Sequence, residues 1–571
     1  MAMVINTNVS SLTAQRALAE SNAELQTAME RLSTGSKINS AADDAAGLAM
    51  TQRMTAQVKG LAMAVKNAND GQALTQSIEG ALGEVSDMLQ RMRELALQAA
   101  NGTNSSADRT FLQSEVNLLI QEISRVATNT RYNGELILDG TFLNKSLQVG
   151  IEEGENIIFS VESVAAESVG AHTLVGNGIG ASPAAADPAS NSTTIEDDIE
   201  IFGFLGTKST EASTGDSAKQ TGVKINNLTG ETGVKAYAKT FASLASSSAT
   251  AKTYSVKING YSTGNFVISS GDVESAVDAI NQISGSTGVT ASSSGNKVVL
   301  FDSDGDDITV ENTQTLAGHS DLVVAKLGED GLVTNVIGQE VSLAVSGGTD
   351  ATRVTGTLKM VSANPFSIDQ KFQTTTNTTN TLVNGAISSG ASKVVLDSLT
   401  GLGVGTAIRF AGDSVPTTHY ITAINPDGDN ALEISFTPAV DETVEDDSRL
   451  YVDTGYYTDA ASTSSLKNLT QININTALNA GDSISIIDAA LDKVAQMRSD
   501  LGAIENRLAY TVSNLMNIAE KTADARSRLD DADYALESAR LAKAQVVQQA
   551  GTSMLAQANQ MTQLVLDLLR G

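Results

Sequence analysis

The sequence predicts an α+β multidomain protein, with coiled-coil-like helical regions at the two ends of the chain that pack together and β-rich domains between them. Three observations predict this. Apolar residues recur at alternating spacings of three and four near both termini, the pattern of helices that lie along other helices. All 6 prolines and all 3 histidines fall in the middle of the chain. Short alternating runs rich in Ser, Thr, Gly and Val fill that middle, as expected for strands separated by turns.

The first helix is expected within residues 1–44. Its apolar seam consists of Ala14, Leu18, Ser21, Leu25, Ala28 and Leu32. No glycine interrupts the chain before Gly35, which should end the helix because glycine adopts the left-handed conformation without strain. Ser40 and Asp43 then resemble a capping box, which predicts the start of the next helix.

Two further helices are expected within residues 45–180. The first has a seam of Ile78, Leu82, Val85, Leu89, Met92, Ala96 and Ala99, and the second a face of Leu112, Val116, Leu119, Ile123 and Val126. Asn101-Gly102 should separate the two helices. Asn133-Gly134 predicts a turn, and Leu136–Leu138 is expected to pair with Leu147–Val149 as a short hairpin.

The middle of the chain is expected to form two β-rich domains, residues 181–372 and 373–480. The predicted strands are Thr253–Ile258, Lys297–Phe301, Ala407–Phe410 and Leu432–Phe436. An Ala/Ser/Pro linker is expected at Ser182–Thr194, and the threonine-rich stretch 373–382 indicates a boundary.

Helical spacing returns in residues 481–530 and 531–571. In the first stretch the seam residues are Val494, Leu501, Leu508, Leu515 and Leu529, with Met497, Ile504 and Ile518 on the accompanying row. In the second, they are Val547, Met554, Met561 and Leu568, with Ala550 and Leu564 on the same side. This last stripe is too thin to form a core alone, so we expect the N-terminal helix to be its partner. For the stretch 481–530, a generic long helix is the alternative interpretation.

Composition excludes several classes of function. With 66 acidic and 37 basic residues, the net charge of -29 disfavours nucleic acid and anionic membranes as partners. Cysteine is absent, so disulfides and thiol chemistry do not contribute. The N-terminus lacks the basic and apolar regions of a secretory signal peptide, and no apolar run is long enough to predict a transmembrane helix.

Several runs near both ends resemble the signature of bacterial flagellin. They are Arg31–Gly35, Ile38–Ala49, Asn67–Gly71, Glu79–Leu82, Leu89–Leu95, Asp531–Tyr534 and Gln548–Gln560. The resemblance covers about residues 1–170 and 480–571. Ser36-Lys37, Met561-Thr562 and the final Gly571 depart from the usual family residues, but none of them breaks a seam.

The resemblance implies how these regions are used. Residues 1–44 and 531–571 would pair in the inner tube of a filament, 45–180 and 481–530 would form the outer tube, and the variable central domains would project outward. Lys257–Gly260, Ala279–Asn281 and Gly288–Ala291 resemble a small module inserted in many flagellins, near residues 253–310. The implied function is a structural filament subunit for swimming motility. The implied location is the extracellular flagellum, reached by type III secretion. The implied partners are other copies of the chain, an export chaperone, and hook-associated and cap proteins.

The resemblance also suggests functional residues. The inner-tube assembly seam would be Leu18, Leu25, Leu32, Val547, Met554, Met561 and Leu568. The outer-tube seam would be Ile78, Leu82, Leu89, Met92, Val494, Leu501, Leu508 and Leu515. Arg91, Leu95 and Glu115 match flagellin positions recognised by the innate receptor Toll-like receptor 5, which also serve subunit contacts.

No residue pattern indicates catalysis or a cofactor. A zinc protease in the middle would need His-Glu-x-x-His, and the three histidines, His172, His319 and His419, stand far apart. The acidic run Asp302–Asp307 lacks the sixth-position glycine and the twelfth-position glutamate of a calcium loop, so a solvated turn is expected. Asn425–Asp429 is likewise interpreted as a turn. The alternatives are a hook–filament junction protein and a filament protein whose central domain is adhesive.

Overall fold

A computed structural model of the chain forms two compact units. The first comprises Met1–Ala81, Arg131–Glu162 and Arg498–Gly571, and the second comprises Leu82–Thr130 and Ser163–Met497. The structure describes residues 8–571 except 179, 185–198, 211–215, 249, 270, 315–321, 346–349, 371–381, 398, 400–406, 411–418, 425–431, 449, 453–455 and 457–460. Within 561–570 it describes the backbone only.

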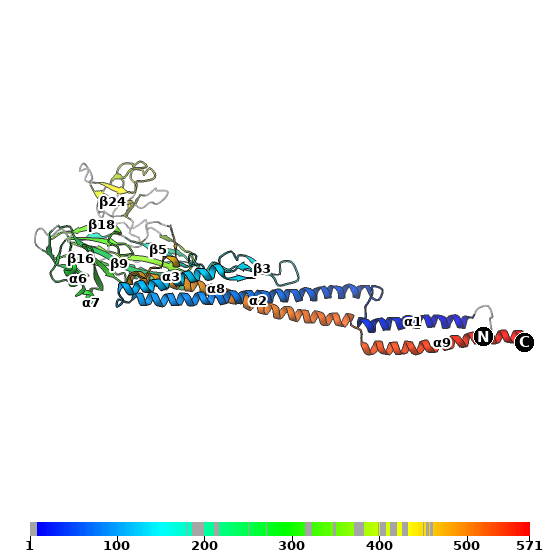
Figure 1. Cartoon of the computed structure of the whole chain (residues 1–571). Coiled ribbons are helices and arrows are strands. Elements are labelled where there is room, and N and C mark those ends of the chain that lie inside the picture. Colours follow the sequence, from blue (N-terminus) through cyan, green and yellow to red (C-terminus); the bar gives the residue numbers. More distant parts are fainter. Residues whose placement is uncertain are drawn as a thin grey trace. The chain divides into compact units, whose positions relative to one another are not determined.

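The first unit is mainly helical. Its helices are α1 (Val9–Thr34), α9 (Tyr534–Arg570), the first part of α2 (Ala45–Ala100) and the last part of α8 (Ala477–Asp530). The Asn8 side chain caps α1 by accepting a hydrogen bond from the Ser11 N–H, and Gly35 ends the helix at φ 74°, as predicted. Figure 1 shows α1 and α9 running side by side.

The start of α2 differs from the prediction. Asp43 does accept hydrogen bonds from the backbone and hydroxyl of Ser40. These bonds close a turn rather than a helix. The helix begins at Ala45, and Asp44 Oδ1 accepts the N–H of Gly47 at 2.9 Å. Asp43 and Asp44 are adjacent, so the sequence alone did not show which of them caps the helix.

The break between α1 and α2 lies beside the break between α8 and α9. Ser36 and Asp531 form an antiparallel bridge. The Lys37 N–H donates to the Asp530 carbonyl at 2.5 Å, and the Ala532 N–H donates to the Gly35 carbonyl at 2.9 Å. The breaks in the two helical paths are therefore bonded to each other.

Two local hairpins complete the first unit. They are β1 (Arg131–Tyr132) with β2 (Glu135–Leu136), and β3 (Lys145–Gln148) with β4 (Asn156–Phe159). Asn133 (φ 51°) and Gly134 (φ 90°) form the predicted turn. The predicted pairing of 136–138 with 147–149 is wrong, because each strand pairs with its nearest neighbour across its own turn. A Cβ on Gly71 would lie 2.5 Å from Leu147 Cδ1, so this glycine lets the second hairpin rest on α2.

In its described residues, the second unit combines helices with four larger sheets and one strand pair. Its remaining helices are α3 (Ser106–Asn129), α4 (Ala218–Asn227), α5 (Thr229–Thr232), α6 (Glu274–Asn281), α7 (Ser284–Thr287) and the 3-10 turn η1 (Leu469–Gln471). The largest sheet has the order β14-β15-β9-β20-β5-β28, with β17 pairing to β9 and β18 to β17. Its strands are β14 (Val289–Ser294), β15 (Lys297–Asp302), β9 (Lys235–Ser246), β20 (Thr357–Ser362), β5 (Gly170–Gly176), β28 (Ser465–Asn468), β17 (Leu322–Leu327) and β18 (Val336–Leu343).

The other sheets are smaller. One has the order β12 (Tyr261–Ser262), β11 (Val256–Ile258), β16 (Ile308–Asn312), β19 (Ala351–Val354), β6 (Ser182–Ala184). Another has the order β27 (Ala461–Thr463), β21 (Ser367–Gln370), β7 (Ile199–Phe202), β8 (Thr207–Ser209). A third has the order β22 (Lys393–Val395), β25 (Glu433–Thr437), β24 (His419–Ile424), β23 (Ala407–Phe410), β26 (Leu450–Val452). A separate pair joins β10 (Lys252–Tyr254) and β13 (Phe266–Ile268).

Most of the predicted strands are present. β23 coincides with the prediction, and β15 and β25 agree within one residue. Thr253–Ile258 is the exception, because Ser255 divides it between β10 and β11, which belong to different sheets. The predicted linker begins with strand β6, and the rest of it, most of 373–382 and Asn425–Asp429 lie outside the described residues.

Candidate functional site

The α1–α9 pair is the first candidate site. The two helices run antiparallel with Cα atoms within 8 Å. Most facing residues are small or polar, with leucines between them: on α1 they are Ser11, Ala14, Leu18, Ser21, Leu25, Ala28 and Leu32, all buried or half-buried. On α9 they are Glu537, Leu541, Ala544, Gln548, Gly551, Leu555 and Ala558, buried or half-buried as well. The stripe predicted on α1 is therefore the one that faces its partner.

The apolar stripe predicted on α9 does not face α1. Val547 is 43% exposed and Met554 is 65% exposed, so they do not face α1. The contact uses the neighbouring stripe of small residues, where a Cβ on Gly551 would lie 3.3 Å from Leu18 Cδ1. Small side chains let the two backbones approach closely, which the bulkier Val and Met would prevent. The side chains of Met561 and Leu568 lie outside the described residues, so their part in assembly stays a prediction.

Polar groups hold much of this seam together. Contacts that cross it include Ser21 Oγ to the Ala544 carbonyl (3.1 Å), Gln548 Nε2 to Asn22 Oδ1 (2.7 Å), Arg31 Nη1 to Glu537 Oε1 (3.4 Å), Asn8 Nδ2 to the Ala558 carbonyl (3.1 Å) and Ser11 Oγ to Asn559 Oδ1 (3.1 Å). The Glu537 side chain is only 5% exposed. A seam of this kind buries little apolar area, and each neutral hydrogen bond contributes only about 1 kcal/mol net.

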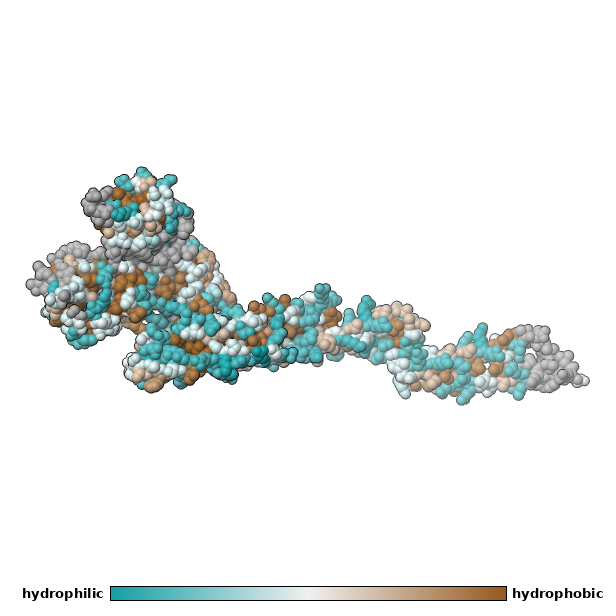
Figure 2. Space-filling model, turned by 45° about the horizontal axis from the view of Figure 1, so that its top comes forward, coloured by the Kyte–Doolittle hydropathy of each residue, from teal (hydrophilic) through white to brown (hydrophobic). Residues whose placement is uncertain are grey.

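Apolar side chains remain on the outer faces of the same two helices. They are Val9, Leu12 and Met29 on α1, and Leu536, Val546, Val547 and Met554 on α9, all exposed. Figure 2 shows hydrophobic residues reaching the surface of the helices among hydrophilic ones. These residues are unused by the seam and are available to another molecule.

The seam predicted for the second helical layer consists of buried residues. Ile78, Leu82, Leu89, Met92, Val494, Leu501, Leu508 and Leu515 are each at most 7% exposed. Within the first unit, Leu508 packs with Ala68, Val149 and Ile157. Leu515 packs with Leu61 and Ala64 in a second cluster there.

Ion pairs flank these buried residues. In the first unit Arg498 Nη2 lies 2.7 Å from Glu79 Oε1. In the second unit Arg93 Nε lies 2.6 Å from Asp488 Oδ1, and the hydrogen bond to Asp488 raises the pKa of Arg93. Both pairs are partly exposed, so we attribute the stability of these helices to the apolar contacts.

Two of the three candidate receptor contacts lie together on the surface of the second unit. Arg91 Nε donates to Glu115 Oε1 at 2.9 Å, and Arg91 Nη1 lies 2.9 Å from Glu94 Oε2. The hydrogen bonds to Glu94 and then Glu115 raise the pKa of Arg91. The side chains of Arg91 and Glu115 are 50% and 45% exposed, whereas Leu95 is 1% exposed. A direct contact between Leu95 and a receptor therefore does not fit this conformation; Leu95 packs beneath the surface pair.

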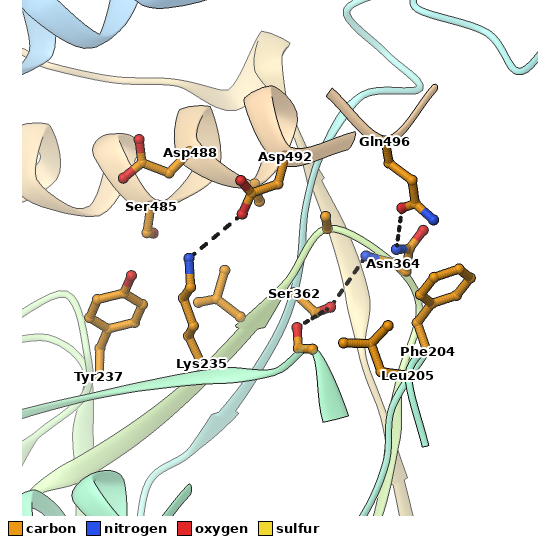
Figure 3. A pocket seen from close by; sticks show the side chains of 14 residues that line it. Phe204, Leu205, Lys235, Tyr237, Ser362, Asn364, Ser485, Asp488, Asp492 and Gln496 are labelled. Carbon is orange, nitrogen blue, oxygen red and sulfur yellow. Dashed lines mark hydrogen bonds and ion pairs between the residues drawn. The ribbon is translucent and has the colours of Figure 1, made fainter. Parts of the chain in front are cut away.

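A hollow of about 350 Å³ in the second unit was not anticipated from the sequence. Figure 3 shows it between the β9–β20 sheet and helix α8, with Phe204 and Leu205 at one rim. Lys235 Nζ lies 3.6 Å from Asp492 Oδ2, and Asn364 Nδ2 donates to Gln496 Oε1 at 3.1 Å. These two contacts join the sheet side of the hollow to helix α8.

The acidic turn Asp302–Asp307 is an ion-paired structural element. Asp302 Oδ1 accepts the N–H groups of Asp304 and Gly305. Lys219 Nζ lies 3.0 Å from Asp304 Oδ2 and 2.8 Å from Asp306 Oδ2, and these hydrogen bonds raise the pKa of Lys219. Lys219 therefore forms ion pairs with a turn that the sequence predicted to be exposed to solvent. Across the described residues, no group of three His, Cys, Asp or Glu side chains is placed to hold a metal ion.

Paired terminal helices around a β-rich middle, with apolar side chains left on their outer faces, define a self-assembling structural protein. None of the helices in the described part of the chain has the length and apolarity that crossing a membrane requires. The family model of the bacterial flagellin N-terminal helical region matches residues 5–142, and that of the C-terminal helical region matches residues 484–569.

Full-length relatives agree. B-type flagellin of Pseudomonas aeruginosa is 32% identical over 570 residues, and flagellin of Salmonella typhimurium is 33% identical over 577, each covering 100% of both chains. The chain belongs to the bacterial flagellin family and is a structural subunit of the flagellar filament. A solved structure of flagellar hook associated protein-3 from Legionella pneumophila is 14% identical and covers 84% of this chain and 98% of that one, with a TM-score of 0.29. That score carries no argument for the junction alternative.

Proposed function

We propose that this chain polymerises through the outer faces of α1 and α9, with the β-rich middle on the outside of the filament. The observation that supports this is the row of exposed apolar residues, Val9, Leu12, Met29, Val547 and Met554, on faces that the α1–α9 seam does not use. Burying such side chains contributes about 1.5–3 kcal/mol each. Because the two faces differ, contact between copies is heterologous and generates a helix rather than a closed dimer.

The thin seam fits a pair that becomes stable only in the polymer. α1 alone is 26 residues long and buries mainly Ser and Ala, so tertiary packing from neighbouring copies must supply most of its stability. The same exposed stripe on α9 offers a surface for an export chaperone before assembly. We therefore propose secretion of the chain in an export-competent state, with hook-associated and cap proteins contacting the same helices at the filament ends.

A charge placed in the outer stripe tests the assembly surface. Met554→Asp should abolish elongation from sheared filament seeds, because a carboxylate would be buried without a partner in the polymer. Thr552→Asp is the matched control, since Thr552 is an exposed polar residue of the same helix. Light scattering and electron microscopy measure growth, and far-UV circular dichroism compares the monomers. Elongation of Met554→Asp at the rate of Thr552→Asp would refute the proposed surface.

We also propose that Arg91 and Glu115 form part of a surface recognised by Toll-like receptor 5. Arg91→Glu should reduce receptor signalling by the monomer at least about tenfold, because a charge-assisted contact is replaced by repulsion. The double variant Arg91→Glu/Glu115→Arg keeps the intramolecular ion pair in reversed order. Signalling restored by the double variant would mean that only the pair's structural role matters, and the proposal would fail.

A further inference from the structure

Two segments of the middle share a sequence pattern. Ile225–Ala236 and Ile280–Ala291 both have Ile-Asn at the start, then Gly, Thr-Gly-Val and a final Ala at the same spacings. In each, the first residues end one helix and the next form a single short turn of helix before a strand: α4, α5 and β9 in the first, and α6, α7 and β14 in the second. The order and spacing of the elements are the same in both segments.

The shared residues make the same hydrogen bonds. Asn226 Nδ2 donates to the Ala236 carbonyl at 2.9 Å, and its Oδ1 accepts the Ala236 N–H at 2.8 Å. Asn281 bonds to Ala291 in the same two ways, at 2.9 and 2.8 Å. In both segments the glycine before the valine has φ 75°, the left-handed conformation that ends a helix. The two hydrogen bonds between each asparagine and its alanine, here called the amide clamp, and the glycine cap are thus the same in both segments. They indicate two copies of one structural module.

The surrounding strands also correspond. The strand order β8-β7-β21-β27 in one sheet matches β12-β11-β16-β19 in another. In each, a hairpin (β7–β8 or β11–β12) precedes the helix, and its inner strand pairs with the strand that follows β20 or β15. The cores are separate: one includes Ile225, Val234 and Met360, and the other includes Ile280, Val289 and Leu300, with no residue in common.

The second copy lies inside a hairpin of the first. In the second copy, β14 and β15 are joined by a tight turn, Gly295-Asn296, closed by the pair Ser294 and Lys297. The corresponding closing pair of the first copy is Lys239 and Thr357, on β9 and β20. The chain between them, residues 240–356, contains the whole second copy.

The chain passes from the first core to the second, and back again, close to Lys239 and Thr357. On β9, Ala236 belongs to the first core, whereas Ala242 and Leu244 belong to the second. On the return, Val354 belongs to the second core and Leu358 to the first. β9 therefore serves both copies in turn, and its single long strand spans the point of insertion.

We propose that residues 240–356 are an inserted copy of the module that surrounds them, and that the chain folds and polymerises without them. The polymerisation part rests on the function proposed above. Contacts between the copies include polar ones, such as Lys219 Nζ to Asp304 Oδ2 at 3.0 Å and to Asp306 Oδ2 at 2.8 Å. The insert also touches the edge of the first core, where the backbone of Gly305 lies against Ala238 and that of Gly356 against Ala218.

The test replaces residues 240–356 by Gly-Asn in the full chain, which copies the turn of the second module in the register of Lys239 and Thr357. The expected product keeps a cooperative thermal transition and elongates filament seeds at a rate within about twofold of the parent chain, because the closing pair and turn are those of an existing hairpin. The matched control replaces residues 236–352, a deletion of the same length that removes Ala236 and its clamp, and it should not fold.

Hydrogen exchange gives a second measure. Asn281→Ala should accelerate exchange about tenfold within residues 252–354 and leave residues 199–239 and 357–370 at the parent rate, because the lost amide bonds belong to one core. Equal acceleration in both sets, or failure of the Gly-Asn variant to fold, would overturn the inserted module. A folded variant that does not polymerise while the parent does would overturn dispensability alone. Failure of the parent to polymerise would instead count against the proposed function.

Discussion

The first unit contains two antiparallel helix pairs, α2–α8 and α1–α9, whose contacts are made by different kinds of residue. Where α2 and α8 meet, Leu508 and Leu515 fill apolar clusters with Leu61 and Val149. Where α1 and α9 meet, the buried positions are Ser11, Ser21, Ala28, Glu537 and Ala544. The first pair is built to be stable in the free chain. The second approaches closely, bonds through polar groups and leaves its larger apolar residues exposed.

The largest expected effect tests the stable pair. Leu508→Ala should lower the free energy of unfolding by about 2–5 kcal/mol, because it leaves a cavity among fully buried residues. Chemical denaturation of the monomer followed by far-UV circular dichroism measures it. Val547→Ala on α9 is the control and should leave the transition of the free chain unchanged. A comparable loss in both variants would mean that the two pairs do not differ as described.

Replacing a glycine by alanine should change stability in opposite directions in the two helix pairs. Gly71→Ala in α2 places a Cβ 2.5 Å from Leu147 Cδ1 and 3.4 Å from Leu508 Cδ1, so it should destabilise the monomer by about 1–3 kcal/mol. Gly551→Ala in α9 meets only the end of Leu18 at 3.3 Å, and the better helix propensity of alanine should stabilise α9 by up to about 1 kcal/mol. Thermal melts of the two variants decide the signs, and destabilisation by Gly551→Ala would show a tighter seam than the structure indicates.

The smallest effect concerns a single polar contact. Ser21→Ala removes the hydrogen bond to the Ala544 carbonyl but keeps a small side chain in the seam. The helix can keep its close approach, so the cost should be at most about 1 kcal/mol. Hydrogen exchange of α1 and α9 amides measures it. Complete loss of protection would mean that polar contacts, rather than close backbone approach, hold the pair.

The sequence predicted the helical ends, the α1 stripe and the buried residues of α2 and α8, because large apolar residues at regular spacing identify a buried face. The same rule failed on α9. There Val547 and Met554 are the conspicuous residues, yet the contact is made by Ala544, Gln548 and Gly551, which carry no apolar signal. In a sequence, an exposed apolar stripe and a buried one have the same spacing, so the pattern alone did not tell them apart.

Other differences have similar causes. Leu95 was grouped with Arg91 and Glu115 because all three match flagellin positions, and that resemblance did not reveal that Leu95 is buried. The nested module could have been found from the repeat of Ile225–Ala236 in Ile280–Ala291. Its insertion into the β9–β20 hairpin could not, because strand partners more than a hundred residues apart leave no local pattern.

The bonded breaks between α1 and α2 and between α8 and α9 have a mechanical consequence. Gly35, Lys37, Asp530 and Ala532 tie the two interruptions together at one level. Sliding of α1 along α9 would break these backbone hydrogen bonds. The two interruptions therefore fix the register of the helix pair at its end.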